Sequence, residues 1–325
     1  MPKAIRIHET GGPEVLRWED SPECEPQAGE VRLRQTAVGL NFIDTYHRSG
    51  LYPLESLPSG VGMEGAGVVE AVGLEVSHLQ VGDRVAYAGG PIGSYAETRI
   101  MPADRLVQLP KEIDDQQGAA LMLKGLTTHY LLRLCYPVKQ GETILIHAAA
   151  GGVGLLACQW AKHLGATVIG TVGTEEKAKL ASEFGCDFPI IYSKENFVER
   201  VHEITDGAGV PVVFDSVGNE TFMQSLDCLK PRGVLVSFGQ SSGVVPPIDI
   251  RVLSEKGSLF LTRPTLGTYA KERAALTEMS RELFDIVGSG AVKIEVGQTF
   301  ALKEAAEAHR ALEGRRTTGS TVLLS

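Results

Sequence analysis

Residues 143–154 have the sequence TILIHAAAGGVG. The apolar run over the first five residues predicts a buried strand, and the small and glycine residues after it predict a tight turn. Residues 155–164 are predicted to form a helix, and residues 166–172 a second strand. The stretch therefore predicts a βαβ unit of a parallel sheet.

The turn has the spacing of the dinucleotide-binding fingerprint, with Ala149 in place of the first glycine. Gly151 lets the backbone approach a pyrophosphate, and Gly154 lets the helix and the strand pack closely. The amides that open the helix offer hydrogen-bond donors and a positive dipole end to phosphate. A purely structural glycine turn is the alternative, but the position between a strand and a helix favours a dinucleotide site.

The end of the second strand bears on which dinucleotide is bound. Residues 170–174 have the sequence GTVGT, with no carboxylate to accept hydrogen bonds from the NAD ribose. Gly173 leaves room for a 2′-phosphate, Lys177 can supply a charge to it, and Tyr192 can add a hydroxyl group. These features favour NADPH over NADH. Glu175 and Glu176 weigh against this preference, and a solvated helix lysine is the alternative role for Lys177.

Composition bounds the possible functions. The chain has 325 residues, 43% of them apolar, which suggests two domains with a core in each. Its net charge of −9, from 40 acidic and 31 basic residues, and the absence of a long basic run argue against a protein that binds nucleic-acid backbones.

The cysteines and the N-terminal sequence bear on compartment. The five cysteines are scattered along the chain without a C-x-x-C pair, so neither a zinc site nor a redox dithiol is expected. Residues 1–12 lack the apolar core of a signal peptide, and no stretch approaches 18 uninterrupted apolar residues. We therefore expect a soluble protein of the reducing cytoplasm that does not enter a membrane.

The first part of the chain, residues 1–120, consists of short alternating segments broken by glycine and proline, which predicts a compact, barrel-like β domain. The glycine-dense residues 60–67 within it suggest bulges or close backbone approach rather than a phosphate loop. The expected strands are residues 3–8, 30–38, 61–73, 83–88 and 95–101.

Residues 121–265 are expected to form the second domain, introduced by a helix over residues 117–134. Strands and helices alternate there, which predicts a doubly wound, six-stranded parallel sheet. Beyond the βαβ unit, we expect strands at residues 188–192, 210–215, 233–238 and 258–262 and helices at residues 175–184, 196–204 and 221–229.

Residues 266–325 are expected to return to the first domain and complete it, with the active site in a cleft between the domains at the carboxyl ends of the parallel strands. The expected elements are helices at residues 271–287 and 303–312 and strands at residues 292–300 and 321–324.

This layout resembles the medium-chain dehydrogenase/reductase superfamily, and more narrowly its bacterial quinone oxidoreductases of the zeta-crystallin group. The similarity extends over essentially the whole chain. The residues that carry it are Gly12-Pro13-Glu14-Val15-Leu16, Asn41-Phe42-Ile43-Asp44-Thr45-Tyr46, Arg48-Ser49-Gly50-Leu51-Tyr52-Pro53, residues 147–154, residues 170–174 and Asp215-Ser216-Val217-Gly218.

The resemblance implies an α/β protein in which a GroES-like β-barrel catalytic domain precedes a Rossmann domain. Two departures from the zinc alcohol dehydrogenases are informative: Asn41 stands at their catalytic cysteine, and Met63 stands in place of the histidine of their Gly-His-Glu motif. The four-cysteine lobe of the structural zinc is also missing. An amide and a thioether cannot replace a thiolate and an imidazole around zinc, so no metal is expected.

The resemblance also implies a set of site residues. Asn41, Asp44, Tyr46 and Tyr52 would line the cleft beside the nicotinamide; alternatively, Asp44 and Tyr46 cap and pack a loop without a catalytic role. Residues implied to contact NADPH are Asn41, Lys124, Thr127, Gly151, Gly152, Val153, Gly154, Gly173, Lys177, Tyr192, Val217, Gly218, Phe238, Gly239, Gln240, Ser241, Arg263 and Arg315.

Three of the neighbouring side chains have open roles. Surface salt bridges explain Arg263 and Arg315 at least as well as contact with the cofactor. His147, at the end of a buried strand, is expected to be a hydrogen-bonded packing residue rather than a catalyst.

The function implied is NADPH-dependent reduction of quinones without zinc, by a homodimer that forms through the edge strand near residues 258–262. Whether one or two electrons pass at a time, and whether a semiquinone is released, stays open. An enone or 2-alkenal reductase of the same superfamily is one alternative. A crystallin-like protein that binds NADPH or RNA without catalysis is another, which the negative charge disfavours.

Overall fold

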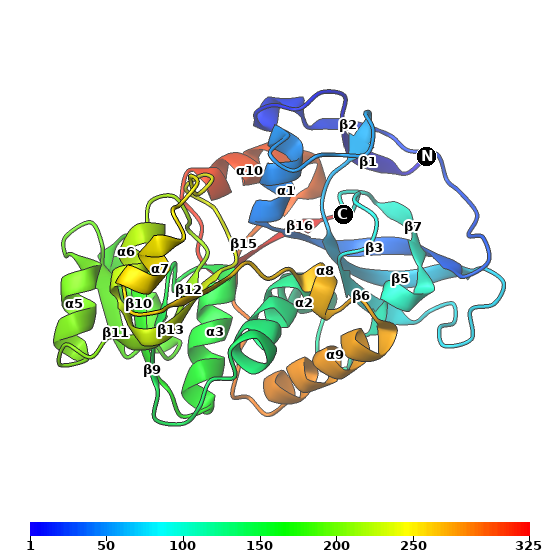
Figure 1. Cartoon of the computed structure of the whole chain (residues 1–325). Helices are drawn as coiled ribbons and strands as arrows, with labels where there is room; N and C mark the ends of the chain where they lie inside the picture. The colour runs from blue at the N-terminus through cyan, green and yellow to red at the C-terminus, as the bar shows by residue number, and fades with distance from the viewer. The chain divides into compact units, whose positions relative to one another are not determined.

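The computed structural model describes all 325 residues (Figure 1), which divide into two compact units. Unit 1 comprises Met1–Leu126, Ala270–Phe284 and Ile294–Ser325, and unit 2 comprises Thr127–Tyr269 and Asp285–Lys293. Residues 285–293, which lie within the segment expected to complete the first domain, therefore belong to unit 2.

Unit 1 is built around two sheets. The larger has seven strands in the order β15-β16-β3-β5-β6-β8, with β7 also paired to β3, and the smaller has the order β2-β1-β4. Their strands are β1 (Lys3–Ile7), β2 (Arg17–Asp20), β3 (Glu30–Leu40), β4 (Ser59–Gly60), β5 (Glu64–Val72), β6 (Arg84–Ala88), β7 (Thr98–Pro102), β8 (Val107–Gln108), β15 (Val296–Ala301) and β16 (Ser320–Leu324).

The long strand β3 organises the larger sheet. Alternate apolar side chains at its start, Val31 and Leu33, are fully buried with those of the neighbouring strands, as the period of a half-buried strand requires. The register between β3 and β5 shifts twice, and a Cβ at Gly67 would lie 2.2 Å from the carbonyl oxygen of Arg34. The glycine-dense segment thus permits bulges and close backbone approach, as expected.

The C-terminal strand β16 pairs antiparallel with β3, from Thr321 opposite Leu40 to Leu324 opposite Ala37. The end of the described chain thereby lies within the sheet that the first 120 residues begin. Unit 1 also contains the short helices η1 (Pro13–Val15), η2 (Ala103–Arg105) and η4 (Leu302–Glu304) and the longer helices α1 (Phe42–Ser49) and α10 (Ala305–Glu313). Helix α9 (Arg273–Gly288) begins in unit 1, and its last four residues belong to unit 2.

Helix α1 was not expected in a domain that the sequence predicts to be all-β. Local capping explains why α1 forms. The Asp44 carboxylate accepts a hydrogen bond from the backbone amide of Asn41 at 2.9 Å, and Gly50 ends the helix with a left-handed φ of +83°. A helix of eight residues is too short to produce a clear 3.6-residue periodicity, and its ends are the only local signal.

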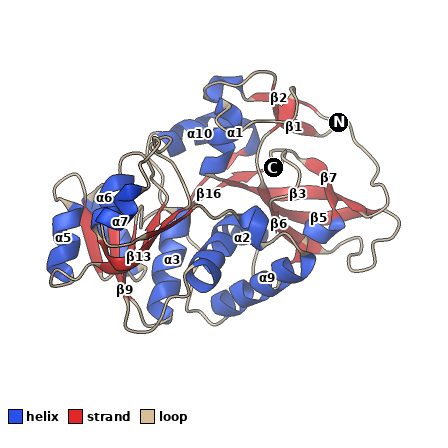
Figure 2. Ribbon diagram, in the orientation of Figure 1, coloured by secondary structure: helices blue, strands red, loops and turns tan.

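Unit 2 contains a six-stranded, all-parallel sheet in the order β11-β10-β9-β12-β13-β14, which confirms the predicted doubly wound sheet. Figure 2 shows helix α5 on one side of this sheet and α3 on the other. The strands are β9 (Thr143–Ile146), β10 (Thr167–Val172), β11 (Phe188–Ile191), β12 (Val210–Asp215), β13 (Leu229–Ser237) and β14 (Phe260–Thr262).

The helices of unit 2 follow the predicted alternation, with two additions. The short helices α7 and α8, of five and four residues, are absent from the predicted set. The helices are α3 (Gly152–His163), α4 (Glu175–Glu183), α5 (Phe197–Ile204), α6 (Phe222–Asp227), α7 (Arg251–Glu255) and α8 (Leu266–Tyr269); α2 (Asp115–His129) runs into the unit and continues as the π-helix η3 (Tyr130–Cys135). None of the helices combines the length and the apolar character that a membrane span requires.

Helix α3 begins at Gly152, three residues before the predicted start at residue 155. Glycine has a low helix propensity, so the two glycines at positions 152 and 154 suggest a turn when the sequence is considered alone. Close packing overrides this propensity, because Gly154 lies so near the backbone of Ala148 and Ala149 that only glycine fits there.

Candidate functional site

The glycine turn of unit 2 joins β9 to α3 and has no space for a larger residue at Gly154. A Cβ at Gly154 would lie 2.3 Å from the carbonyl oxygen of Ala148 and 2.7 Å from the Cα of Ala149, which no real Cβ tolerates. Gly151, in an extended conformation at the N-cap, would bring a Cβ within 3.2 Å of the same carbonyl oxygen. Gly151 is the N-cap of α3, so the backbone amides of Gly152 and the residues after it form the first turn of that helix, the position from which amides can donate to a phosphate.

The loops that follow β12 and β13 pack against each other at the carboxyl end of the sheet. Gly218 has a left-handed φ of +88°, and its Cβ would lie 2.9 Å from the Cα of Gln240. A Cβ at Gly239 would lie 2.5 Å from the carbonyl oxygen of Ser216. Arg263 donates a hydrogen bond to the carbonyl oxygen of Gly239 at 2.8 Å, so the structure brings three of the predicted cofactor-binding segments together.

Asp215 anchors the first of these loops. Its fully buried carboxylate accepts hydrogen bonds from the backbone amides of Val217 and Gly218 at 2.7 and 3.0 Å. Ser225 connects this carboxylate to His147, whose Nε2 lies 3.0 Å from the serine hydroxyl. Burial lowers the pKa of His147, which favours the neutral ring. His147 is therefore buried and hydrogen-bonded, as expected for a packing residue.

The end of β10 brings Gly173 and Tyr192 together, because a Cβ at Gly173 would lie 2.8 Å from the Tyr192 hydroxyl oxygen. Glu175, one of the two acids that weigh against a phosphate here, pairs with Lys194 at 2.5 Å. Lys194 is outside the predicted set of site residues. The only feature of the sequence that points to a role for it here is its position two residues after Tyr192. The backbone amide of Lys177 is capped by the Thr174 hydroxyl, which places the lysine in the first turn of α4.

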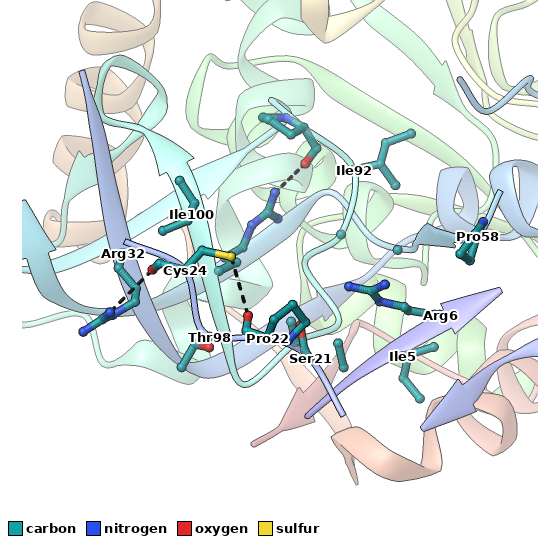
Figure 3. Close-up of a pocket in the computed structure, with 16 residues that line it drawn as sticks. Ile5, Arg6, Ser21, Pro22, Cys24, Arg32, Pro58, Ile92, Thr98 and Ile100 are labelled. Carbon is teal, nitrogen blue, oxygen red and sulfur yellow. Dashed lines mark hydrogen bonds between the residues drawn. The ribbon is translucent and has the colours of Figure 1, made fainter. Parts of the chain in front are cut away.

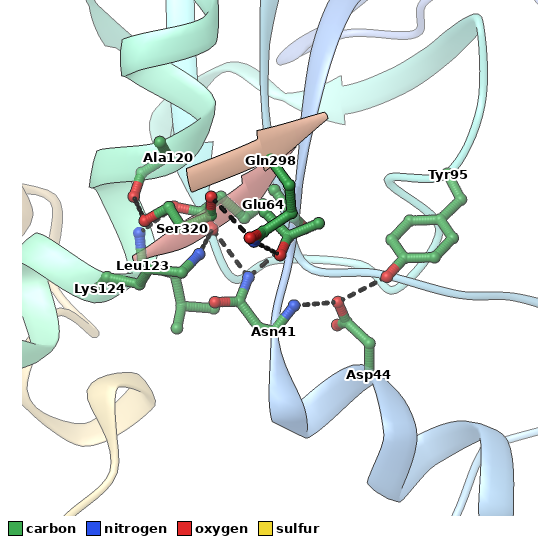
Figure 4. A network of polar contacts seen from close by, with 11 residues as sticks. Asn41, Asp44, Glu64, Tyr95, Ala120, Leu123, Lys124, Gln298 and Ser320 are labelled. Atoms are coloured by element: carbon green, nitrogen blue, oxygen red, sulfur yellow. Dashed lines mark hydrogen bonds and ion pairs between the residues drawn. The ribbon is translucent and has the colours of Figure 1, made fainter. Parts of the chain in front are cut away.

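A buried charge network surrounds Asn41 in unit 1 (Figure 4). The Glu64 carboxylate, fully buried at the start of β5, accepts hydrogen bonds from the Asn41 side-chain amide at 2.7 Å and from the Leu123 backbone amide at 2.6 Å. The ammonium group of Lys124 lies 3.1 Å from the same carboxylate. Asn41 and Lys124, two predicted site residues, are thus joined through Glu64, an acid outside the predicted set.

Asp44 is also fully buried, in the first turn of α1. Its Oδ2 accepts hydrogen bonds from the Asn41 backbone amide and from the Tyr95 hydroxyl, both at 2.9 Å. Burial raises the pKa of this carboxyl to about 7, although both hydrogen bonds favour the anion. Asp44 caps a helix, as the structural alternative expected, and its burial accounts for the raised pKa of its carboxyl.

The remaining predicted residues fall in either unit. Tyr46 is buried, and its ring meets that of Tyr52 edge-to-face with centroids 5.2 Å apart. Thr127 is buried in α2 within unit 2, whereas Arg315 follows α10 in unit 1 with a left-handed φ of +57°. Val153 is the second residue of α3.

A cavity of about 350 Å³ lies elsewhere in unit 1 (Figure 3), and none of the predicted site residues lines it. Three arginines line it, and two of them have acceptors within the protein: Arg32 pairs with Glu25 at 2.9 Å, and Arg99 donates to the carbonyl oxygen of Pro91 at 2.6 Å. The structure contains no group of three or more histidine, cysteine or acidic side chains arranged to hold a metal ion.

A β domain with a glycine-rich sheet and a parallel sheet with a dinucleotide turn are the two parts of a nucleotide-dependent dehydrogenase or reductase. Family models match both parts: the alcohol dehydrogenase GroES-like domain matches residues 27–111, and the zinc-binding dehydrogenase model matches residues 152–281.

Individual relatives match the whole chain. A quinone oxidoreductase of Pseudomonas aeruginosa is 58% identical to this chain, and the match covers 100% of both proteins. A 2-haloacrylate reductase of a Burkholderia species is 49% identical, and the match covers 100% of this chain and 99% of that protein. The crystal structure of Escherichia coli quinone oxidoreductase complexed with NADPH is 50% identical, has a TM-score of 0.98, and covers 99% of this chain and 100% of that one. The chain belongs to the medium-chain dehydrogenase/reductase superfamily and, within it, to the bacterial quinone oxidoreductases.

Proposed function

We propose that this protein reduces quinones with NADPH as the electron donor. The main support is the turn between β9 and α3, where Gly151 caps a helix that starts at Gly152 and Gly154 packs too closely on Ala148 for any larger residue. The same turn belongs to a chain 50% identical to a quinone oxidoreductase whose crystal structure contains NADPH. When bound, the nicotinamide supplies the reducing electrons.

The donor set around Asn41 supports a reaction without zinc. The Asn41 amide nitrogen is already committed to Glu64, and neither an amide nor the Met63 thioether replaces the thiolate or imidazole that zinc prefers. A quinone is electrophilic enough to be reduced without a Lewis acid. The protein then has to bind and orient the acceptor and to exclude water. We propose that Asn41, Asp44, Tyr46 and Tyr52 contact the quinone.

In unit 2, the predicted cofactor residues divide by the part of NADPH that they would hold. The turn at residues 151–154 would hold the pyrophosphate, and the loops containing Gly218 and Gly239 would contact the nicotinamide half. Gly173, Lys177 and Tyr192 would surround the 2′-phosphate, with Glu175 neutralised by Lys194.

The first test is NADPH oxidation by purified, metal-free protein with 1,4-benzoquinone, and in parallel with a simple enone. We expect quinone-dependent turnover with NADPH preferred over NADH. Lys177→Ala should raise the KM for NADPH by about tenfold, because a charge partner of the 2′-phosphate contributes about 1.4 kcal/mol, and should leave NADH kinetics unchanged. Lys179→Ala, which removes a lysine from the exposed face of the same helix, is the control.

Reduction of an activated alkene is the second candidate, because a 2-haloacrylate reductase is 49% identical over the whole chain. Turnover of the enone but not of benzoquinone would favour it. Binding of NADPH with turnover of neither acceptor would contradict both enzymatic functions and favour a binding protein. Equal effects of Lys177→Ala and Lys179→Ala would contradict the assignment of the phosphate site.

We also propose that the protein is a cytoplasmic homodimer that pairs through β14. This strand is at the edge of the parallel sheet, and its residues Phe260 and Leu261 are 60% and 38% exposed. An unpaired edge with exposed apolar residues is a ready template for strand pairing. Sedimentation should show a dimer for the natural sequence and a monomer for Phe260→Arg, whereas Met223→Arg, also exposed in unit 2, should stay dimeric. A monomeric natural sequence would contradict the proposed dimer.

Fractionation of cells tests the proposed cytoplasmic location.

A further inference from the structure

A chain of hydrogen bonds buried in unit 1 leads from Arg48 to Asp44. The Arg48 guanidinium, with 3% of its side chain exposed, lies 3.0 Å from Nδ1 of His309 in helix α10. Nε2 of His309 lies 3.0 Å from the hydroxyl oxygen of Tyr95, and this hydroxyl lies 2.9 Å from Oδ2 of Asp44. At its far end, Arg48 also pairs with Glu313 at 2.7 Å.

The chemistry of arginine fixes the direction of every bond in this chain. A guanidinium group has donors and no acceptor, so Nδ1 of His309 must accept. Burial and the charge of Arg48 lower the pKa of His309 to about 3, so the ring is neutral and its single proton is on Nε2. Nε2–H then donates to the Tyr95 oxygen, and the Tyr95 hydroxyl must donate to Asp44.

The direction has a consequence for the two oxygens of Asp44. Oδ2 accepts from Tyr95 and from the Asn41 backbone amide, whereas Oδ1 is buried and has no hydrogen-bond partner. A proton on Oδ2 would face two donors and displace one of them. A protonated Asp44 must therefore keep its proton on Oδ1.

We propose that Arg48, His309 and Tyr95 form a positioning relay for the candidate substrate site, which holds Asp44 by Oδ2 and restricts its uptake and release of a proton to Oδ1. The role of the relay in catalysis rests on the proposed function, because reduction of a quinone consumes a proton that Asp44 would supply. Asp44 would hold on Oδ1 the proton that a quinone oxygen takes up when hydride reaches the quinone, and it would regain a proton from water after the hydroquinone leaves. The other three residues would act through Asp44.

Several other charged groups influence the titration of Asp44. Lys124 on α2 favours the carboxylate, and Glu64 on β5 opposes it. Arg48 acts through the relay, with its own charge shared with Glu313. Because burial brings the pKa of Asp44 to about 7, both protonation states are populated at neutral pH, as a group that gives and regains protons during turnover requires.

The first experiment follows the Asp44 carboxyl carbon by NMR over a range of pH, in protein without NADPH or quinone. Its signal is assigned by its absence in Asp44→Asn. Tyr95→Phe removes a donor that favours the anion, and should move the midpoint upward by about one pH unit. Tyr87→Phe is the matched control: Tyr87 is equally buried in unit 1, but its hydroxyl donates to Gln35, away from the relay. An unchanged midpoint in Tyr95→Phe, or the same shift in both variants, would overturn the proposal.

A pair of substitutions at His309 provides the second arm and decides the result if Tyr95→Phe does not fold. Glutamine can accept from Arg48 and donate to Tyr95, so His309→Gln should keep the midpoint of Asp44 near its natural value. His309→Leu breaks the relay but leaves the Tyr95 hydroxyl beside Asp44, so it should raise the midpoint by less than Tyr95→Phe does. Equal midpoints in the two variants would contradict the relay.

The titration does not depend on turnover, so it separates the relay from the proposed function. If the function is also correct, the pH profile of kcat for benzoquinone reduction should shift in the same direction as the NMR midpoint in Tyr95→Phe. A shifted midpoint with an unshifted profile would leave Asp44 out of the reaction and contradict its proton-holding role. Absence of quinone turnover in every variant would count against the function alone.

Discussion

Replacing Glu64 with glutamine should lower the free energy of unfolding by about 3–5 kcal/mol, the usual cost of breaking a buried ion pair by removing one partner. The fully buried carboxylate receives three donors, from the Asn41 side chain, the Leu123 backbone and the Lys124 ammonium group. A glutamine side chain has one acceptor oxygen, and its amide nitrogen would face one of these donors. It also removes the negative charge beside a buried lysine. Urea unfolding measures the difference.

Glu70 supplies the control because it is on the same strand, β5, and pairs with Arg34 at 3.1 Å near the surface. Its side chain is 30% exposed, so Glu70→Gln should cost no more than about 1 kcal/mol. Equal losses for the two variants would mean that burial of the Glu64 network contributes nothing beyond an ordinary surface pair. Because Glu64 also holds the Asn41 amide, any folded Glu64→Gln protein should show a raised KM for benzoquinone.

Gly154→Ala should disturb both stability and cofactor binding. The new methyl group would lie 2.3 Å from the Ala148 carbonyl oxygen, so helix α3 or the turn must move, at a cost of about 1–3 kcal/mol in the free energy of unfolding. Displacing the start of α3 also displaces the amides that we assign to the pyrophosphate. We therefore expect the Kd for NADPH to rise by about tenfold or more, as measured by fluorescence titration.

Gly151→Ala separates the two effects. Its Cβ would meet only the Ala148 carbonyl oxygen, at 3.2 Å, so the turn has to yield only slightly and stability should change little. The methyl group would nevertheless stand where the pyrophosphate approaches, and NADPH affinity should fall. Gly288→Ala, at the end of α9 with no atom near its Cβ, should change neither quantity. Unchanged NADPH affinity in both turn variants would contradict the assignment of the turn.

The parallel sheet and its turn could be predicted from the sequence because their signals are local. The strands β9 and β12 have nearly continuous apolar runs, as strands buried on both faces require, and the glycines stand at fixed offsets between a strand and a helix. Even there, the start of α3 was placed three residues late, because glycine propensity says nothing of the close packing at Gly154.

The polar networks of unit 1 could not be predicted, because their members come from distant parts of the chain. Tyr95 and His309 are separated by 214 residues, and Asn41 and Glu64 by 23. No periodicity or spacing in the sequence distinguishes His309 from the other residues of its amphipathic helix. Tyr95 lies in a loop, and the sequence does not indicate which residue its hydroxyl group contacts. Glu64 has one sequence signal, an acid within a glycine-dense segment, and that signal does not reveal that the carboxylate is buried.

The pairing of β16 with β3 bears on the order in which the molecule is assembled during synthesis. Nearly all of unit 2 leaves the ribosome as one continuous segment, Thr127–Tyr269, and domains generally fold as units once they emerge. Unit 1 has to wait, because β15, β16 and α10 follow unit 2 in the chain. The nascent protein can therefore form its nucleotide-binding half while β3 still has an open edge and Asp44 still lacks the histidine that completes its relay.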